Sequence, residues 1–211
     1  GEAAGDYSGW SVSLSTDGSV VAIGVKGNHG TGASGLVRIY KNINDTWTKI
    51  GNDIEGEGVL DRSGNSVSLS ADGSVVAIGA DENDENGFNS GHVRIFKNVN
   101  NTWTKIGDDI DGEASLDFSG NSVSLSAEGS VVAIGAYGND GNGNSSGHVR
   151  IYQNINDTWT KIGSDIDGEA AGDKSGYSVS LSADGSVVAI GANRNDGNGT
   201  DSGHVRIYQN V

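Results

Sequence analysis

The sequence predicts an all-β fold, a β-propeller-like array of four four-stranded antiparallel blades in which the last blade lacks one strand. Two observations lead to this prediction. A Ser-Gly motif recurs four times with spacings of 55, 56 and 56 residues, starting at Ser8, Ser63, Ser119 and Ser175. Every copy also contains short blocks with the apolar pattern of β-strands, and four antiparallel strands in a repeat of this length are typical of a propeller blade.

Four blocks in each repeat predict the strands, and the first repeat illustrates them. The first block alternates polar and apolar residues, which places Val12 and Leu14 on one face. An Asp-Gly turn follows it. The second block, Val-Val-Ala-Ile at 20–23, is apolar on both faces, as a strand covered on both sides should be. The third block, Val-Arg-Ile-Tyr, begins at Val37, and the fourth, Thr-Trp-Thr-Lys-Ile, begins at Thr46.

The repeats form a single repeat domain over residues 1–211. Their approximate bounds are 1–57, 58–113, 114–169 and 170–211. The fourth block occurs only three times, so the chain equals four repeats minus one strand. Since the chain does not begin with Met, we expect a mature product or a segment of something longer.

Length, charge and composition exclude several classes of protein. The 211 residues include 28 acidic and 13 basic side chains, which gives a formal net charge of −15. Such an acidic chain is a poor partner for nucleic acid, whose binding depends on Lys and Arg. The absence of Cys excludes disulfides and thiolate metal sites. No apolar stretch reaches the roughly 18 residues of a membrane helix, so we expect no membrane insertion.

Three blocks of the last repeat together resemble the FG-GAP repeat, which builds the propeller head of integrin α chains and many secreted proteins. These blocks begin at Ser175, Ser186 and Gly203, and the resemblance covers all four copies. It implies an extracellular or cell-surface, non-enzymatic propeller used for adhesion or as a scaffold. The chain departs from the family because the hairpin at 16–19 is too short for the family's Asp-rich calcium loop, so that calcium site is not carried over.

The loops between the second and third strands are the remaining candidates for a metal site. They contain a pattern of oxygen ligands at Asp140, Asn142, Asn144, Asp196, Asn198, Thr200 and Asp201. The second repeat has Phe88 at the third ligand position, and the first repeat has no carboxylate at 28–32. Because one or two carboxylates are fewer than tight calcium sites use, we favour simple Gly- and Asn-rich turns. We expect that the protein requires no cofactor. If these loops bind an ion, we expect it to be Ca²⁺.

Trp10 and Tyr177 are the candidate ligand-binding residues, because they break the repeat at a position where the other copies have Asn. Exposed aromatic rings beside Asn and Asp are typical of sugar-binding sites. The three repeated tryptophans are expected instead to cap the hydrophobic core between blades. They are Trp47, Trp103 and Trp159.

Two further sets of polar residues recur with the repeat. A carboxylate pair occurs four times, at Glu2 and Asp6, Glu57 and Asp61, Glu113 and Asp117, and Glu169 and Asp173. Because a catalytic pair is expected only once, we predict that these aspartates accept backbone N–H groups in the turns between blades. Histidine begins the third strand at His92, His148 and His204. A ring of imidazoles could bind metal, but Leu36 at the same position favours packing.

Five N-x-Ser/Thr sequons lie in predicted surface turns, where glycosylation in a secretory pathway is feasible. They are Asn44, Asn100, Asn144, Asn156 and Asn198.

These observations lead to one prediction of function and one alternative. We predict a non-enzymatic extracellular structural or adhesive repeat module, part of a larger surface assembly or filament. Its partners are proteins or further copies of itself, bound through the open edge of the last blade. The alternative is a lectin-like propeller that binds glycans with the assistance of calcium.

Overall fold

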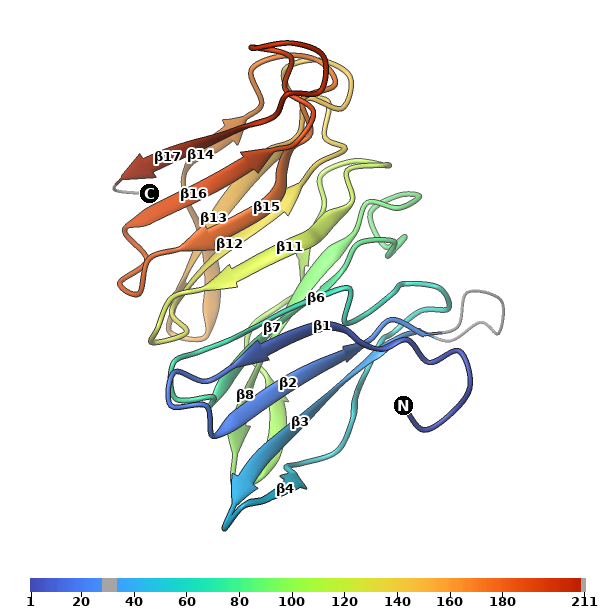
Figure 1. Cartoon of the computed structure of the whole chain (residues 1–211), viewed down its shortest axis with the longest axis vertical. Coiled ribbons are helices and arrows are strands. Elements are labelled where there is room, and N and C mark those ends of the chain that lie inside the picture. The colour runs from blue at the N-terminus through green and yellow to red at the C-terminus, as the bar shows by residue number, and fades with distance from the viewer. Residues whose placement is uncertain (28–33, 210–211) are drawn as a thin grey trace.

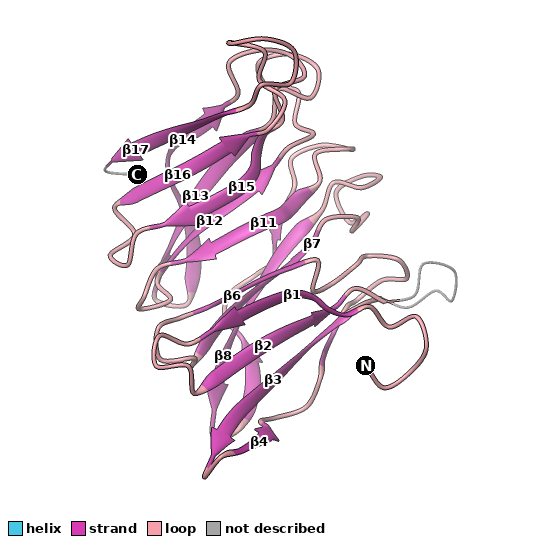
Figure 2. Ribbon diagram, viewed as in Figure 1, coloured by secondary structure: helices cyan, strands magenta, loops and turns pink. Residues whose placement is uncertain are grey.

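The computed structural model describes residues 1–27 and 34–209 and confirms the predicted fold. The chain forms four antiparallel sheets that follow one another as the blades of a propeller, and the last blade has three strands. Figure 2 shows strands joined by loops and turns. Within the described part of the chain we find no helix with the length and apolar character that crossing a membrane requires.

The bounds of the strands follow the four blocks predicted from the sequence. Blade 1 contains β1 (Ser8–Leu14), β2 (Val20–Val25), β3 (Leu36–Ile43), β4 (Thr46–Lys49) and β5 (Ile54–Glu55). Blade 2 contains β6 (Ser66–Leu69), β7 (Val75–Ala80), β8 (His92–Val99), β9 (Thr102–Lys105) and β10 (Ile110–Asp111). Blade 3 contains β11 (Ser119–Leu125), β12 (Val131–Ala136), β13 (His148–Ile155) and β14 (Thr158–Asp167). Blade 4 contains β15 (Ser175–Leu181), β16 (Val187–Ala192) and β17 (His204–Gln209).

Within each blade the strands pair in chain order, so each sheet is an antiparallel meander. The short strands β5 and β10 pair with β3 and β8 and continue the fourth strand of their blades after an interruption. In blade 3 the corresponding segment forms one strand, β14, whose register shifts opposite Val149 and Ile151. The first strands of adjacent blades, such as β6 and β11, contact one another and form the inner layer of the array.

The connections use the turn residues that such hairpins require. The turn between β3 and β4 has two residues, Asn44 and Asp45, with φ of 51° and 61°. Positive φ at both positions is typical of a type I′ turn, whose twist matches that of the flanking strands. In the turn after β1, the Asp17 carboxylate accepts hydrogen bonds from the Ser15 hydroxyl and the Ser19 N–H, which confirms the short Asp-Gly hairpin.

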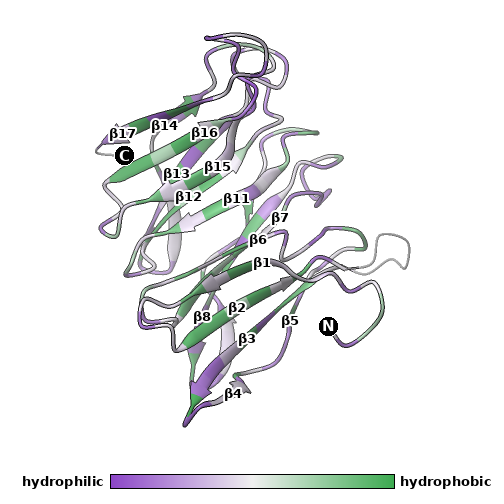
Figure 3. Cartoon of the chain, viewed as in Figure 1, coloured by the Kyte–Doolittle hydropathy of each residue, from purple (hydrophilic) through white to green (hydrophobic). Residues whose placement is uncertain are grey.

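The hydrophobic core lies between the blades. Three clusters of buried side chains fill the junctions of blades 1 and 2, 2 and 3, and 3 and 4. Figure 3 shows the apolar residues concentrated along second strands such as β2 and β16. Figure 1 shows the blades following one another in an open arc, with blade 1 at one end and blade 4 at the other.

Candidate functional site

Each interior junction joins two different faces of the repeat. At the junction of blades 2 and 3, blade 2 contributes Val93 and Ile95, and blade 3 contributes Leu125 and Ile134. None of the four side chains is more than 7% exposed. We call the face of a blade that contacts the following blade its forward face, and the face that contacts the preceding blade its back face.

The back face of blade 1 is uncovered. Val12 and Leu14 are 65% and 60% exposed, although Leu69 and Leu125, which correspond to Leu14 in blades 2 and 3, are both 7% exposed. The same residue type therefore changes from core to surface because blade 1 has no preceding blade in the described structure.

The forward face of blade 4 is uncovered in the same way. Val205 and Ile207 of β17 are 64% and 69% exposed, whereas Val93 and Ile95 at the corresponding positions of blade 2 are 0% and 2% exposed. The two ends of the array thus present complementary halves of the junction that the interior of the chain contains three times.

The repeated tryptophans confirm the expected capping of the core where a preceding blade exists. The indole Nε1 of Trp103 donates a hydrogen bond of 2.9 Å to the Ile50 carbonyl, and that of Trp159 donates one of 2.9 Å to the Ile106 carbonyl. Both rings pack against the inter-blade clusters. Trp47 belongs to blade 1 and is 48% exposed.

A ladder of hydrogen bonds crosses the inner strands and connects the two aromatic residues that break the repeat. The Trp10 indole donates to Asn65 Oδ1, the Asn65 amide donates to the Asn121 carbonyl, and the Asn121 amide donates to the Tyr177 carbonyl. Trp10 on β1 and Tyr177 on β15 therefore stand at opposite ends of the ladder. Asparagine at the interior positions serves to bridge adjacent blades.

Trp10 and Tyr177 belong to two separate aromatic groups. Tyr7 lies edge-on to Trp10 with ring centroids 6.5 Å apart. Tyr137 lies 5.8 Å from Tyr177, and its other neighbour, Phe118, stacks on it at 5.1 Å. The second group is the larger. Phe118 and Tyr137 also differ from their counterparts in the other repeats, and this was the signal in the sequence that could have identified the group.

A buried carboxylate lies near the first aromatic group. The Lys26 ammonium lies 3.9 Å from the centroid of the Trp10 ring. Burial raises the pKa of the Asp81 carboxyl to about 6, although Lys26 and Arg62 attract its negative charge. Burial also lowers the pKa of Lys26. The junction of blades 1 and 2 therefore contains two buried or partly buried ionisable groups, the Lys26 ammonium and the Asp81 carboxyl.

In the candidate calcium loops, several of the oxygen and amide groups already bind the protein backbone. Asp140 Oδ1 accepts the Ser145 N–H at 2.7 Å, and Asp196 Oδ1 accepts the Asp201 N–H at 2.8 Å. The Asn142 amide donates to the carbonyls of Gly168 and Glu169. These bonds fit the turn interpretation, and calcium binding stays a prediction. The first-repeat loop at 28–32 lies outside the described residues.

The recurring aspartates have the structural role expected from the sequence. Asp117 Oδ2 accepts hydrogen bonds from the backbone N–H groups of Glu113 and Ala114 and from the Asn139 amide. Asp61 and Asp173 likewise accept backbone N–H groups and an asparagine amide. Their glutamate partners form ion pairs with the arginines of the third strands. These pairs are Glu2–Arg38, Glu57–Arg94, Glu113–Arg150 and Glu169–Arg206.

The sequon asparagines are all exposed, as surface turns require. Asn44, Asn100 and Asn156 occupy the turns after the third strands, and Asn144 and Asn198 lie in the loops before the third strands. Their glycosylation stays a prediction.

A comparison with models of protein families shows which known repeat the chain resembles. Residues 165–208, from the end of β14 through most of β17, match the model of the FG-GAP repeat. This segment is therefore similar to the FG-GAP repeat. The preceding repeats contain the same Ser-Val-Ser-Leu, Val-Val-Ala-Ile-Gly and Val-Arg-Ile blocks, so the FG-GAP resemblance inferred from the sequence is confirmed on the segment that matches.

Solved structures show the same propeller fold at low sequence identity. Hydrazine synthase from Kuenenia stuttgartiensis is 14% identical with a TM-score of 0.61, over 95% of this chain and 45% of that chain. U3-55K is 11% identical with a TM-score of 0.56, over 94% of this chain and 48% of that chain. The chain thus spans about half the length of these two proteins. A search of curated proteins gives no match.

Proposed function

We propose that this FG-GAP repeat chain is a structural module that assembles head to tail, the forward face of blade 4 of one copy packing on the back face of blade 1 of the next. The observation that carries the proposal is the exposure of Val12, Leu14, Val205 and Ile207, whose counterparts are buried at the interior junctions. Each interior junction supplies a template for the proposed contact, because the same residue types meet there in the same order.

The expected gain is large enough to support association. Full burial of an exposed Val, Leu or Ile side chain contributes about 1.5–3 kcal/mol. Because these four side chains are 60–69% exposed, their burial contributes roughly 4–8 kcal/mol before the cost of association is subtracted. The contact joins two different surfaces. Head-to-tail contacts of this type produce closed rings or open filaments, which agrees with a role in a surface assembly.

The test is the mass of the purified chain in solution over a wide range of concentrations, measured by light scattering and sedimentation. The proposal expects association that increases with concentration and is lost in Leu14→Asp and in Val205→Asp. Val59→Asp is the matched control, because Val59 is 69% exposed but lies in the linker between blades 1 and 2.

Mixing the two variants separates a head-to-tail contact from any other. Leu14→Asp keeps an intact forward face on blade 4, and Val205→Asp keeps an intact back face on blade 1. An equimolar mixture should therefore form a heterodimer that stops at two chains. A wild-type chain that remains monomeric at every concentration, or variants that do not combine, would refute the assembly.

We also propose that the module is non-enzymatic and works outside the cell. FG-GAP repeats are typical of extracellular propellers. The recurring carboxylate pairs support the absence of catalysis, because Asp61, Asp117 and Asp173 bind the backbone of the linkers between blades. Activity of the purified chain in broad hydrolase and lyase screens would contradict this part of the proposal.

A second candidate function, glycan binding, is favoured by the aromatic group of Phe118, Tyr137 and Tyr177. Tyr177 is 47% exposed, and the Lys174 ammonium lies 5.1 Å from the Tyr137 ring. Exposed rings beside polar groups suit the apolar faces of sugars. A glycan array probed with and without calcium tests this candidate, with Tyr177→Asn as the variant because Asn stands at this position in blades 2 and 3. No binding in either condition would remove the lectin function.

A further inference from the structure

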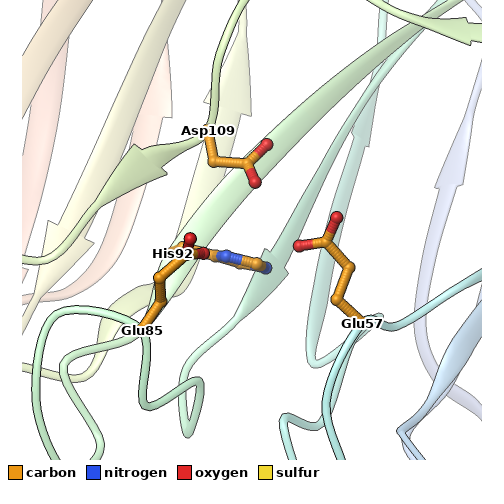
Figure 4. Close-up of side chains that lie close together, drawn as sticks. All are labelled: Glu57, Glu85, His92 and Asp109. Carbon is orange, nitrogen blue, oxygen red and sulfur yellow. The ribbon is translucent and has the colours of Figure 1, made fainter.

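Three carboxylates surround a buried imidazole where blade 1 continues into blade 2. Glu57 comes from the linker after β5, Glu85 from the loop between β7 and β8, and Asp109 from the segment before β10, while His92 begins β8. Each residue offers one ligand atom, and these atoms all lie within 4.8 Å of one another. Figure 4 shows the three carboxylates gathered around the His92 ring.

The imidazole has polar atoms that the described protein does not satisfy. His92 is 0% exposed, and among the described residues neither its Nδ1 nor its Nε2 has a hydrogen-bond partner. A buried polar atom without a partner costs about 1–3 kcal/mol, so a ring with two such atoms requires an explanation. A metal ion bound by one of the two nitrogens would satisfy that nitrogen.

Packing does not account for a histidine at this position. Leu36 occupies the same position in blade 1, which shows that the fold itself does not require a polar side chain there.

Two of the carboxylates are held in place by cations and each keeps a second oxygen. Glu57 Oε1 lies 3.2 Å from Arg94 Nη1, and Asp109 Oδ1 lies 2.7 Å from Lys105 Nζ. Such outer contacts orient metal ligands in known sites. The ligand atoms of Glu57, Glu85 and Asp109 lie within 4.8 Å of one another. Negative charges at this distance repel, and a bound cation would relieve the repulsion.

We propose that Glu57, Glu85, His92 and Asp109 bind a divalent transition-metal ion, with Zn²⁺ as the representative. One imidazole nitrogen and three carboxylate oxygens form a mixed N and O donor set, which suits Zn²⁺ and its first-row neighbours. Calcium and magnesium prefer oxygen ligands alone. The site takes Glu85 from the second repeat's copy of the oxygen-ligand loops considered above, but it differs from them in donor set and preferred ion. It would tie the linker after blade 1 to the β7–β8 loop, the start of β8 and the segment before β10.

A second, weaker copy of the site follows from the repeat. Glu113, His148 and Asp165 form the corresponding group at the next junction, and their ligand atoms also lie within 4.8 Å of one another. Gly141 stands where blade 2 has Glu85, so this copy has one ligand fewer. The chain is thus expected to bind one ion tightly and a second one less tightly.

The test is titration of the metal-free full chain with Zn²⁺ by calorimetry, together with Co²⁺ absorption, which reports the donor set. The key variant is His92→Leu, which copies the residue found in blade 1. Loss of one ligand should weaken the tighter site at least about tenfold, since loss of an outer contact alone commonly costs 10–100-fold. Glu85→Gln, at an exposed side chain, is a second variant that should weaken the same site without disturbing the fold.

His204→Leu is the matched control, because among the described residues His204 is not part of a group of three metal-binding side chains. It should leave the tighter site unchanged, and Ca²⁺ should not compete with Zn²⁺. The proposal is overturned if Zn²⁺ does not bind. It is equally overturned if His92→Leu binds Zn²⁺ as the wild type does, since binding would then reflect surface carboxylates only.

Discussion

Replacing Asp81 by Asn should stabilise the protein at neutral pH. Asp81 directly follows β7, is 5% exposed, and has a carboxyl pKa raised by burial from 3.8 to about 6. One pH unit corresponds to 1.36 kcal/mol, so a rise of roughly two units costs at most about 3 kcal/mol of stability. The last repeat has Asn193 at the corresponding position, so the amide is compatible with this backbone.

The sign of the pH dependence follows from the raised pKa. The folded state keeps the proton up to about pH 6, whereas the unfolded chain loses it near pH 3.8. Stability therefore falls as the pH rises between these values, and the full cost is present above them. Asp81→Asn removes the cost. We expect the free energy of unfolding to increase by about 1–3 kcal/mol at pH 7.5 and by less than about 1 kcal/mol at pH 4.

Urea denaturation followed by tryptophan fluorescence at the two pH values measures this difference. Asp108→Asn, at an exposed carboxyl, makes the same change of charge and should have little effect at either pH. The reasoning fails if Asp81→Asn lowers the stability at pH 7.5, because attraction by Lys26 and Arg62 would then outweigh burial. It also fails if the gain is equal at both pH values.

Two further predictions use the inequivalence of the repeats. A Cβ at Gly79 would overlap the carbonyl oxygen of Gly120 in the next blade, so Gly79→Ala should cost about 3 kcal/mol in thermal denaturation. Gly191, its counterpart in blade 4, would meet only a serine of its own blade, and an equal loss there would contradict the explanation. Trp103→Phe removes a hydrogen bond to the preceding blade and should cost about 1 kcal/mol. The exposed Trp47 is the control, since Trp47→Phe should change stability by less than half as much.

The strands could be predicted from the sequence because their patterns are local. The period of two around Val12 and Leu14 and the doubly apolar 20–23 block each specify a strand without reference to the rest of the chain. The separate strands β5 and β10 could not be predicted, because a closely similar segment forms one strand, β14, in blade 3. That segment has Ser164 where blades 1 and 2 have Asn52 and Asp108.

The candidate metal site, unlike the strands, could not be predicted from a local pattern. Leu36 made packing the simpler interpretation of the histidines, and the three carboxylates around His92 come from separate segments of two repeats. No short motif contains Glu57, Glu85 and Asp109 together. A signal was nevertheless present, because the repeats that carry His92 and His148 also carry Glu and Asp at fixed distances before and after it.

The burial of the second strands connects the stability of the array with its proposed assembly. β7 and β12 are buried at all six positions, whereas β16, with the same Val-Val-Ala-Ile-Gly-Ala sequence as both, alternates between buried and partly buried residues. In a repeat protein each unit is stabilised mainly by its neighbours, so blades 1 and 4, each with one neighbour, are the least stable units of this chain. A head-to-tail contact would give both of them their second neighbour at once. The residues proposed to drive association are therefore the repeat equivalents of the residues whose burial stabilises the interior junctions. A substitution on a terminal face should weaken association and leave the interior junctions intact.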